Sequence, residues 1–249
     1  MKISLSPGHA STTSGKQTPD GMKEWEFNAA VVKCIIDGLE NYEDVQVLRL
    51  DDPSGKKDIS LKTRSDKANA WKSDVHIDIH ANAAGPGGWY DDAKGIETFV
   101  YTSKPKEALT LAQKVQSNLV SATKLQNRGV KAADFHMLRE TKMTSILIEA
   151  GFMTNKDEAK LLKSDNYRRI VAGAILDALV SHYGLKQKAR VSAVKKEDLS
   201  KVWGADSIKK VIDQGVIPGY SDGTWRPNEP IKRAELAVIL DRLGLLNKK

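Results

Sequence analysis

The sequence predicts an α/β protein in which a central, mostly parallel sheet is flanked by helices, followed by a small, mainly helical C-terminal module. Two observations carry this prediction. Strand-like and helix-like segments alternate along residues 1–184, and such alternation builds a sheet with helices on both faces. The last part of the chain, about 50 residues, instead holds two helical segments around a glycine-rich turn. We therefore divide the chain into a domain at 1–184, a lysine-rich linker at 185–196 and a module at 197–249.

The strands of the first domain are predicted from alternation and from short apolar runs. VQVLRL and VHIDIH alternate between apolar and polar residues, whereas SILIEA is apolar and carries a carboxylate near its end. The predicted strands are Lys2–Ser6, Val45–Leu50, Val75–His80, Ile96–Tyr101 and Ser145–Ala150.

The helices are predicted from apolar periodicity and from capping residues. Phe27, Val31 and Ile35 recur at the spacing of one helical face. Ser60 is a candidate helix cap, and Pro105 is typical of a first helical turn. The predicted helices are Glu24–Asn41, a segment from Leu61 to Trp71, a segment from Pro105 to about Ala122, and Asn166–Tyr183.

Composition excludes some classes of protein. Hydrophobic residues make up 40% and charged residues 29% of the 249-residue chain, a balance typical of globular domains. No apolar run approaches the roughly 18 residues of a membrane-spanning helix, so we expect no membrane insertion. Ser4, Ser6 and Pro7 interrupt the N-terminal apolar run, so we expect no secretory signal and synthesis in the cytoplasm. The single cysteine, Cys34, excludes an intrachain disulfide and is expected in the core.

The positive charge is concentrated in the tail. The formal net charge is +7, and Gly184–Lys249 contains 14 Lys/Arg against 8 Asp/Glu, so the first 183 residues carry only +1. A basic tail favours an acidic partner, such as nucleic acid, an anionic membrane or an anionic wall polymer. The alternative is that the lysines only keep the chain soluble.

Four side chains at the ends of predicted elements could form a metal site. His9 follows the first strand, Glu24 begins the first helix, His80 ends VHIDIH and Glu149 lies at the end of SILIEA. Zinc prefers such nitrogen and oxygen ligands, and a catalytic site leaves one position open. Each residue also has a structural alternative: His9 as a loop histidine, Glu24 as a first-turn acid and His80 as a buried strand histidine. A carboxylate directly after SILI is harder to explain without a task or a partner.

The other histidines are expected to be structural. His76 lies on the same strand face as His80, but an extended strand separates the two by roughly 13 Å, too far to share one ion. His136 and His182 are interpreted in the same way.

The motifs, taken in order, resemble a known family. SPGH, the glutamate of GMKEWEFN, DIHANA, RGVK followed by MLRE, and ILIEAGFMTN are similar to the type-3 N-acetylmuramoyl-L-alanine amidases of bacterial autolysins and phage endolysins. The resemblance covers about Lys2–Gly184 and implies the zinc amidase/carboxypeptidase-like fold. One departure is Asp78, because the usual SIHANA of the family is DIHANA in this chain.

The resemblance also implies the roles of individual residues. It implies that His9, Glu24 and His80 bind one zinc ion per chain, and that Glu149 is the catalytic acid–base. Asn82 would line the site as a substrate-binding residue. Arg139, in MLRE, would support substrate binding.

The C-terminal segment resembles an S-layer-homology repeat over about Glu197–Leu243. GYSDGTWRPN and IKRAE carry this resemblance, with one helix ended by Gly215, tight turns at Gly219 and Gly223, and a second helix from near Ile231. It implies attachment to an anionic secondary wall polymer, with Arg233 as the polymer-binding residue. Lys232 replaces the usual threonine, and only one copy is present. The alternative is a degenerate structural appendage.

The expected function is therefore a zinc-dependent hydrolase that cuts the amide bond between N-acetylmuramic acid and the stem-peptide L-alanine. Peptidoglycan and an anionic wall polymer are the expected partners, and nucleic acid is not. A phage endolysin released through a holin pore fits best with the expected absence of a signal peptide. Three alternatives stay open: a sporulation mother-cell autolysin, a zinc peptidase of the stem peptide, and a catalytically inactive wall-binding protein.

Overall fold

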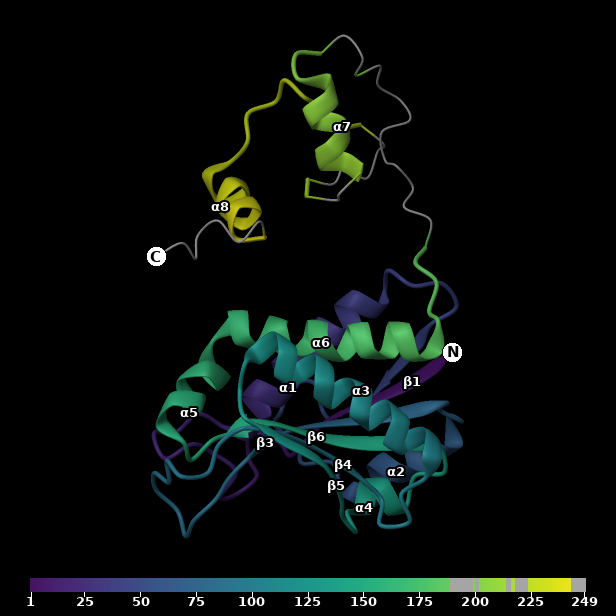
Figure 1. The fold of residues 1–249 in the computed structure, drawn as a ribbon, viewed down its shortest axis with the longest axis vertical. Helices are drawn as coiled ribbons and strands as arrows, with labels where there is room; N and C mark the ends of the chain where they lie inside the picture. Colours follow the sequence, from purple (N-terminus) through teal and green to yellow (C-terminus); the bar gives the residue numbers. More distant parts are fainter. Residues whose placement is uncertain (189–198, 200–201, 214–215, 218–223, 243–249) are drawn as a thin grey trace. The chain divides into compact units, whose positions relative to one another are not determined.

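The computed structural model describes residues 1–188, 199, 202–213, 216–217 and 224–242. The chain divides into two compact units, Met1–Lys188 and Ala189–Lys249, and each is described by itself (Figure 1). The strands of the first unit are β1 (Lys2–Pro7), β2 (Gln46–Arg49), β3 (Val75–Asn82), β4 (Ile96–Val100), β5 (Asn127–Ala132) and β6 (Thr144–Phe152). Its helices are α1 (Glu24–Leu39), α2 (Leu61–Ala70), α3 (Lys106–Thr123), α4 (His136–Arg139), α5 (Lys156–Lys163) and α6 (Asp165–Tyr183).

All six strands form one sheet in the order β2-β1-β3-β6-β4-β5. β1 pairs in parallel with β2 and β3, and β3 pairs in parallel with β6. The direction reverses at β4, which is antiparallel to β6 and parallel to β5. The prediction of a mostly parallel sheet flanked by helices is confirmed, and the carboxyl ends of β1, β3 and β6 meet at one edge.

One face of the sheet is apolar, and α1, α3 and α6 cover it (Figure 1). The strand residues on this face are fully buried, as are the helix residues that pack on them. Burial of apolar surface contributes roughly 25 cal/mol per Å², so this interface stabilises the unit. The buried strand side chains on this face are Ile3, Leu5, Ile77, Ile79, Ile146 and Ile148.

The opposite face is polar but also buried. Ser4, His76, Asp78 and Ser145 share this face, and none is more than 5% exposed. The helices α2 and α4 lie on this side (Figure 1), with a small apolar cluster centred on Met137 beside them. The alternation in VHIDIH therefore separates an apolar layer from a buried polar layer, and not the core from solvent.

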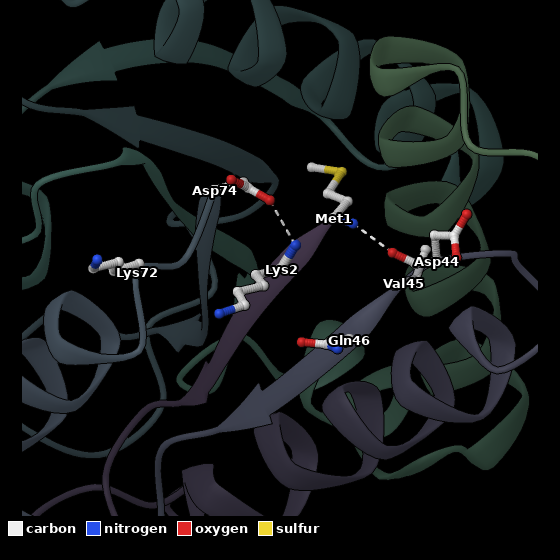
Figure 2. A pocket seen from close by; sticks show the side chains of 7 residues that line it. All are labelled: Met1, Lys2, Asp44, Val45, Gln46, Lys72 and Asp74. Atoms are coloured by element: carbon white, nitrogen blue, oxygen red, sulfur yellow. Dashed lines mark hydrogen bonds between the residues drawn. The ribbon is translucent and has the colours of Figure 1, made fainter.

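The amino end of β1 is fixed by backbone contacts (Figure 2). The amino group of Met1 donates to the Asp44 carbonyl, and the Lys2 amide donates to Asp74 Oδ2 at 2.6 Å. The Gln46 amide donates to the Met1 carbonyl at 2.8 Å, which sets the register of β1 on β2. A shallow pocket opens between these residues, at the end of the strands opposite to His9 and His80.

Some elements and one burial state differ from the sequence predictions. β5, α4 and α5 were not expected: β5 reads NRGVKA, a charged edge strand interrupted by Gly129, and α4 is a single turn of four residues. α5 has eight residues and begins at Asn155, whose side chain accepts from two backbone amides of the first turn. The prediction that Cys34 is a core residue is wrong, because Cys34 is half-buried at the margin of the core.

The described part of the second unit contains α7 (Ala205–Asp213) and α8 (Arg233–Arg242). The two helices were predicted, although α8 begins after Lys232, whose amide donates to Glu235 Oε2 at 3.0 Å. The expected turns at Gly215, Gly219 and Gly223 and most of the expected linker lie outside the described residues. Within the described ranges, no helix has the length and apolar character needed to cross a membrane.

Candidate metal centre and active site

His9 is held in place by the turn that follows β1. The Gly8 amide donates to the Ile79 carbonyl at 2.8 Å, which ties the turn to β3. His9 itself has a φ of 62°, a left-handed conformation that costs a non-glycine residue free energy and persists only where its surroundings fix it. Such strain is concentrated at functional sites, so the conformation supports a role for this side chain.

A buried guanidinium braces the same turn. Arg64 of α2 is only 1% exposed and donates to the Pro7 carbonyl, to Ser6 Oγ at 2.8 Å and to the His9 carbonyl at 2.9 Å. Its fork of donors satisfies carbonyls on both sides of Gly8. Arg64 lies within the predicted Leu61–Trp71 helix, but its contact with the first turn depends on the packing of α2 on the polar face.

Glu24 is the first residue of α1 and is 2% exposed. The helix N-terminus favours a carboxylate at this position. Its Oε1 accepts from the Ala81 amide at 3.2 Å and from Asn28 Nδ2 at 3.2 Å, and Asn28 also donates to the Gly8 carbonyl at 3.1 Å. The carboxylate is therefore fixed against both the SPGH turn and the end of β3.

The two histidines meet this carboxylate from different elements. His80 Nδ1 lies 3.0 Å from Glu24 Oε1, and His9 Nε2 lies 3.3 Å from Glu24 Oε2. One ligand atom from each residue falls within 4.8 Å of the others, and the two rings stand nearly perpendicular at 87°. Gly8 makes this possible, because a Cβ there would lie 2.1 Å from His80 Cε1.

The donor set fits a zinc ion. Ligand atoms about 2.0–2.1 Å from a tetrahedral ion stand roughly 3.3 Å apart, close to the separations of 3.0 Å and 3.3 Å around Glu24. Two imidazoles and one carboxylate are also the donors that zinc prefers in catalytic sites, with one position left for water. The geometry thus brings together the three residues expected as ligands.

Charge coupling within the cluster shifts the pKa values of all three groups. Burial lowers the pKa of His9 to about 4 against the attraction of Glu24. Burial also opposes the charged forms of Glu24 and His80, but their mutual attraction outweighs it, together with the Asp78 carboxylate beside His80. The pKa of Glu24 is therefore lowered and that of His80 raised. In the metal-free protein, a proton on His80 supplies the positive charge that a bound cation would supply. Metal binding should therefore release protons.

Glu149 lies beside this cluster in β6. It is paired with His80 of β3 on one side and with Glu97 of β4 on the other, so the three side chains form a row on one face of the sheet. Its Oε2 is enclosed and has no hydrogen-bond partner among the described residues. Burial, with the nearby carboxylates of Glu24 and Glu97, raises the pKa of Glu149 to about 8. A carboxyl poised near neutral pH is suited to accept and return a proton.

Glu149→Gln is expected to stabilise the metal-free protein much more at pH 8 than at pH 5. The unfolded chain loses the Glu149 proton near the ordinary pKa of 4.5, whereas the folded chain keeps it up to about 8. The wild type therefore loses stability as the pH rises through this window, by an amount on the order of 1–3 kcal/mol, and an uncharged glutamine does not. Urea unfolding of both proteins in chelator at the two pH values measures the difference. A stability difference that is the same at pH 5 and pH 8 would contradict this assignment.

A second network on the far side of Glu149 was not predicted. Glu97 is 4% exposed; its Oε1 accepts from Asn82 Nδ2 at 2.7 Å, and its Oε2 accepts from Arg128 Nε at 2.7 Å and from Lys131 Nζ. These two cations come from β5, within the RGVK motif. The reversed direction of β4 brings them next to Glu149, which sequence spacing does not reveal.

The remaining expected site residues lie in different surroundings. Asn82 is at the end of β3, and its side chain is held by Glu97 as described above. Arg139 of α4 donates to Asp134 Oδ1 at 2.6 Å and to Glu140 Oε1 at 2.8 Å, and its described contacts do not include the cluster. Arg233 belongs to the second unit, where it is exposed at the start of α8.

The three histidines interpreted as structural have partners outside the cluster. His76 is completely buried, with Nδ1 3.1 Å from Ser4 Oγ. His136 Nε2 lies 3.1 Å from Ser65 Oγ, and the His182 ring packs edge-on against Tyr183.

The chain is similar to known protein families in both of its parts. Residues 3–181 match the N-acetylmuramoyl-L-alanine amidase family, and residues 197–237 match the S-layer homology domain. The endolysin of Bacillus phage SPP1 is 35% identical over 98% of this chain and 89% of its own length. The sporulation-specific N-acetylmuramoyl-L-alanine amidase of Bacillus subtilis is 28% identical over 75% of this chain and 70% of its own length.

A solved structure supports the same relationship. The N-acetylmuramoyl-L-alanine amidase from Clostridium difficile 630 superposes with a TM-score of 0.68 at 32% identity, covering 74% of this chain and 96% of its own. The fold, the order of the motifs and the sequence match thus point the same way. The chain belongs to the N-acetylmuramoyl-L-alanine amidase family, acts on peptidoglycan, and carries an S-layer homology domain in its C-terminal part.

Proposed function

We propose that this amidase is zinc-dependent, with one ion per chain held by His9, Glu24 and His80, and with Glu149 as the catalytic acid–base. The observation that carries the proposal is the convergence of two imidazoles on the two oxygens of one buried carboxylate, at 3.0 Å and 3.3 Å. The enclosed oxygen of Glu149 in the neighbouring strand position supports its role, because it has no structural partner among the described residues.

Hydrolysis of the amide needs a strong nucleophile, a stabilised oxyanion and a protonated leaving amine. A bound zinc ion supplies a water of lowered pKa and polarises the carbonyl. Glu149 accepts the proton of the attacking water and delivers it to the departing nitrogen of L-alanine. Arg64 and Asn28 hold the SPGH turn and Glu24 in position, so the donors need no rearrangement.

Two further residues are proposed to contribute to substrate binding. Asn82 ends β3 beside the row of His80 and Glu149, and its bond to Glu97 fixes the side chain at the margin of the site. Arg139 is engaged by Asp134 and Glu140, so we propose that it supports the site through the loop before β6 rather than by a free guanidinium.

The products of wall digestion test the proposed reaction. Purified cell walls are digested, and the fragments are analysed by mass spectrometry and end-group labelling. The amidase releases new N-terminal L-alanine without new reducing sugar, whereas a zinc peptidase would cut within the stem peptide. No release of either product would favour a catalytically inactive wall-binding protein.

We further propose that the protein is a phage endolysin. The support is the match to the endolysin of Bacillus phage SPP1, which runs through both units rather than through the catalytic unit alone. The alternative is a mother-cell autolysin, in line with the sporulation-specific relative. Expression in a walled host with and without a pore-forming holin tests the idea. An endolysin that is released through the pore lyses the cells only when the holin is present. Lysis that is equally fast without the pore would contradict it.

The C-terminal unit is proposed to bind an anionic wall polymer, with Arg233 as a contact. We propose a catalytic domain at 1–184, a linker at 185–196 and the module at 197–249. The structure adds that Lys186 and Lys188 form backbone hydrogen bonds with Glu43 and Asn41 of the first unit. A test fragment should therefore end at Lys188 rather than at Gly184.

The fragment 1–188 is expected to cleave soluble muropeptides at nearly the full-length rate but to bind intact walls more weakly. It keeps every residue of the candidate site and loses 12 Lys/Arg against 8 Asp/Glu. If the attraction is electrostatic, the full-length advantage shrinks between 0.05 and 0.5 M salt, where the screening length falls from roughly 14 to 4 Å. If Arg233 makes a charge-assisted contact, Arg233→Ala removes much of the advantage even at high salt.

The measurement is co-sedimentation of each protein with purified walls across the salt series. Lys232→Ala is the matched control, because it removes a neighbouring exposed cation without touching Arg233. Equal binding by fragment and full-length protein at every salt concentration would reject the wall-binding role and leave a structural appendage.

A further inference from the structure

We propose that Asp78 is a positioning residue for the metal: its carboxylate accepts a hydrogen bond from Nε2–H of His80 and so presents Nδ1 of the same ring to the ion. This inference rests on the proposed zinc site. It concerns a buried carboxylate of β3 that is not among the three converging ligands.

The geometry places the His80 ring between two carboxylates. Nδ1 lies 3.0 Å from Glu24 Oε1, and Nε2 lies 3.5 Å from Asp78 Oδ2. Asp78 and His80 are two residues apart in β3, so both side chains project from the same face of the strand. Since Glu24 and Asp78 face different nitrogens of one ring, the nitrogen directed at the cluster is Nδ1 and the outer partner is Asp78.

The burial of Asp78 needs an explanation that packing does not provide. It is 2% exposed, and its Oδ1 has no hydrogen-bond partner among the described residues. A buried carboxylate without full hydrogen bonding costs free energy. The negative charge of Asp78 therefore has a role other than packing.

The hydrogen bonds of the neighbouring polar side chains go to other partners. The donors of Arg64 go to Ser6 Oγ and to backbone carbonyls, including that of His9. His76, the preceding residue on the same face, uses Nδ1 to meet Ser4 Oγ. Among the described residues, Asp78 makes its close polar side-chain contact with His80, where Oδ2 lies 3.5 Å from Nε2.

The consequence follows from general metal-site chemistry. A carboxylate on the outer nitrogen of a ligating histidine fixes its tautomer and ring orientation and makes the inner nitrogen a stronger donor. Loss of such a partner typically weakens metal binding by about 10–100-fold. Asp78 thus increases the zinc affinity of this chain relative to an otherwise identical site with serine.

The test measures the zinc dissociation constant of Asp78→Asn and Asp78→Ser by competition with a chromophoric chelator, together with thermal unfolding of the metal-free proteins. His76→Ala is the matched control, because it lies on the same strand face and is equally buried but does not contact His80. Both Asp78 variants are expected to bind zinc about 10–100-fold more weakly than the wild type, whether or not their metal-free melting temperatures change. His76→Ala is expected to keep its zinc affinity within about threefold, even if its melting temperature falls.

A merely structural role for Asp78 would give the opposite pattern. In that case both variants lower the melting temperature of the metal-free protein while folded molecules bind zinc as tightly as the wild type, and the inference is overturned. A wild type that binds no zinc would instead reject the proposed metal site itself, so the two failures are distinguishable. Asp78→Ser keeps the test decisive if the asparagine variant does not fold, because serine removes the buried charge with a smaller side chain.

Discussion

Glu149→Gln is expected to lower the rate of amide cleavage by about 10²–10⁴-fold while leaving one zinc bound per chain. The substitution keeps the shape of the side chain but removes its ability to accept a proton from water and return it to the leaving nitrogen. Glu149 is not among the three residues whose ligand atoms converge, so metal binding should be unaffected. Single-turnover rates on muropeptides and elemental analysis of the same preparation measure the two properties together.

Glu97→Gln serves as the control for this experiment. It is the neighbouring carboxylate on the same row of the sheet, but its oxygens are already taken by Asn82, Arg128 and Lys131. Its replacement should leave far more activity than Glu149→Gln. Loss of zinc together with activity in Glu149→Gln would mean that Glu149 is a ligand rather than a proton carrier.

His80→Ala is expected to abolish stoichiometric zinc binding, whereas His76→Ala retains about one zinc per chain. His80 faces Glu24 at 3.0 Å, whereas His76 is completely buried and meets Ser4 on the polar face of the sheet. Both variants remove an imidazole from the same face of β3, so a general effect on the strand would appear in both. Zinc content after dialysis, with circular dichroism to confirm folding, distinguishes them. Equal zinc loss in the two variants would show that the ligand set is wrong.

Much of the candidate site could be predicted because its residues lie in short, ordered motifs. SPGH, DIHANA and ILIEAGF each place one polar group directly at the end of an apolar strand, and parallel strands bring such ends together. That rule places His9, His80 and Glu149 near one another, whereas Glu24 begins a helix, and the choice of His9, Glu24 and His80 as ligands came from the family resemblance. The alternation in VHIDIH also predicted β3, although the structure shows that its polar face is buried.

The supporting residues could not be predicted in the same way. Arg64 acts over 55 residues of sequence on the carbonyl of His9, which requires the packing of α2 on the sheet. The network around Glu97 depends on the reversal of β4, and β5 carries too few apolar residues to be recognised as a strand. Gly8 needs to lack a side chain only because His80 occupies that space. These features are tertiary, and no local pattern encodes them.

The burial of polar residues on the second face of the sheet was the feature hardest to predict from the sequence. Ser4, His76 and Asp78 would face solvent in an ordinary half-buried strand, and their enclosure under α2 and α4 turns Asp78 from a small departure in a motif into a neighbour of His80. Asp78 could be noticed in the sequence, but only the structure shows that its carboxylate lies 3.5 Å from the His80 ring.

The most direct test of the central claim is a zinc titration of the metal-free protein, with activity and bound metal followed in the same samples. Zinc is removed with a chelator, the chelator is washed out, and zinc is returned in steps of a fraction of an equivalent. We expect no amide cleavage by the metal-free protein and a linear rise of activity that ends at one zinc per chain. Full release of N-terminal L-alanine by a preparation that elemental analysis shows to be free of zinc would contradict it.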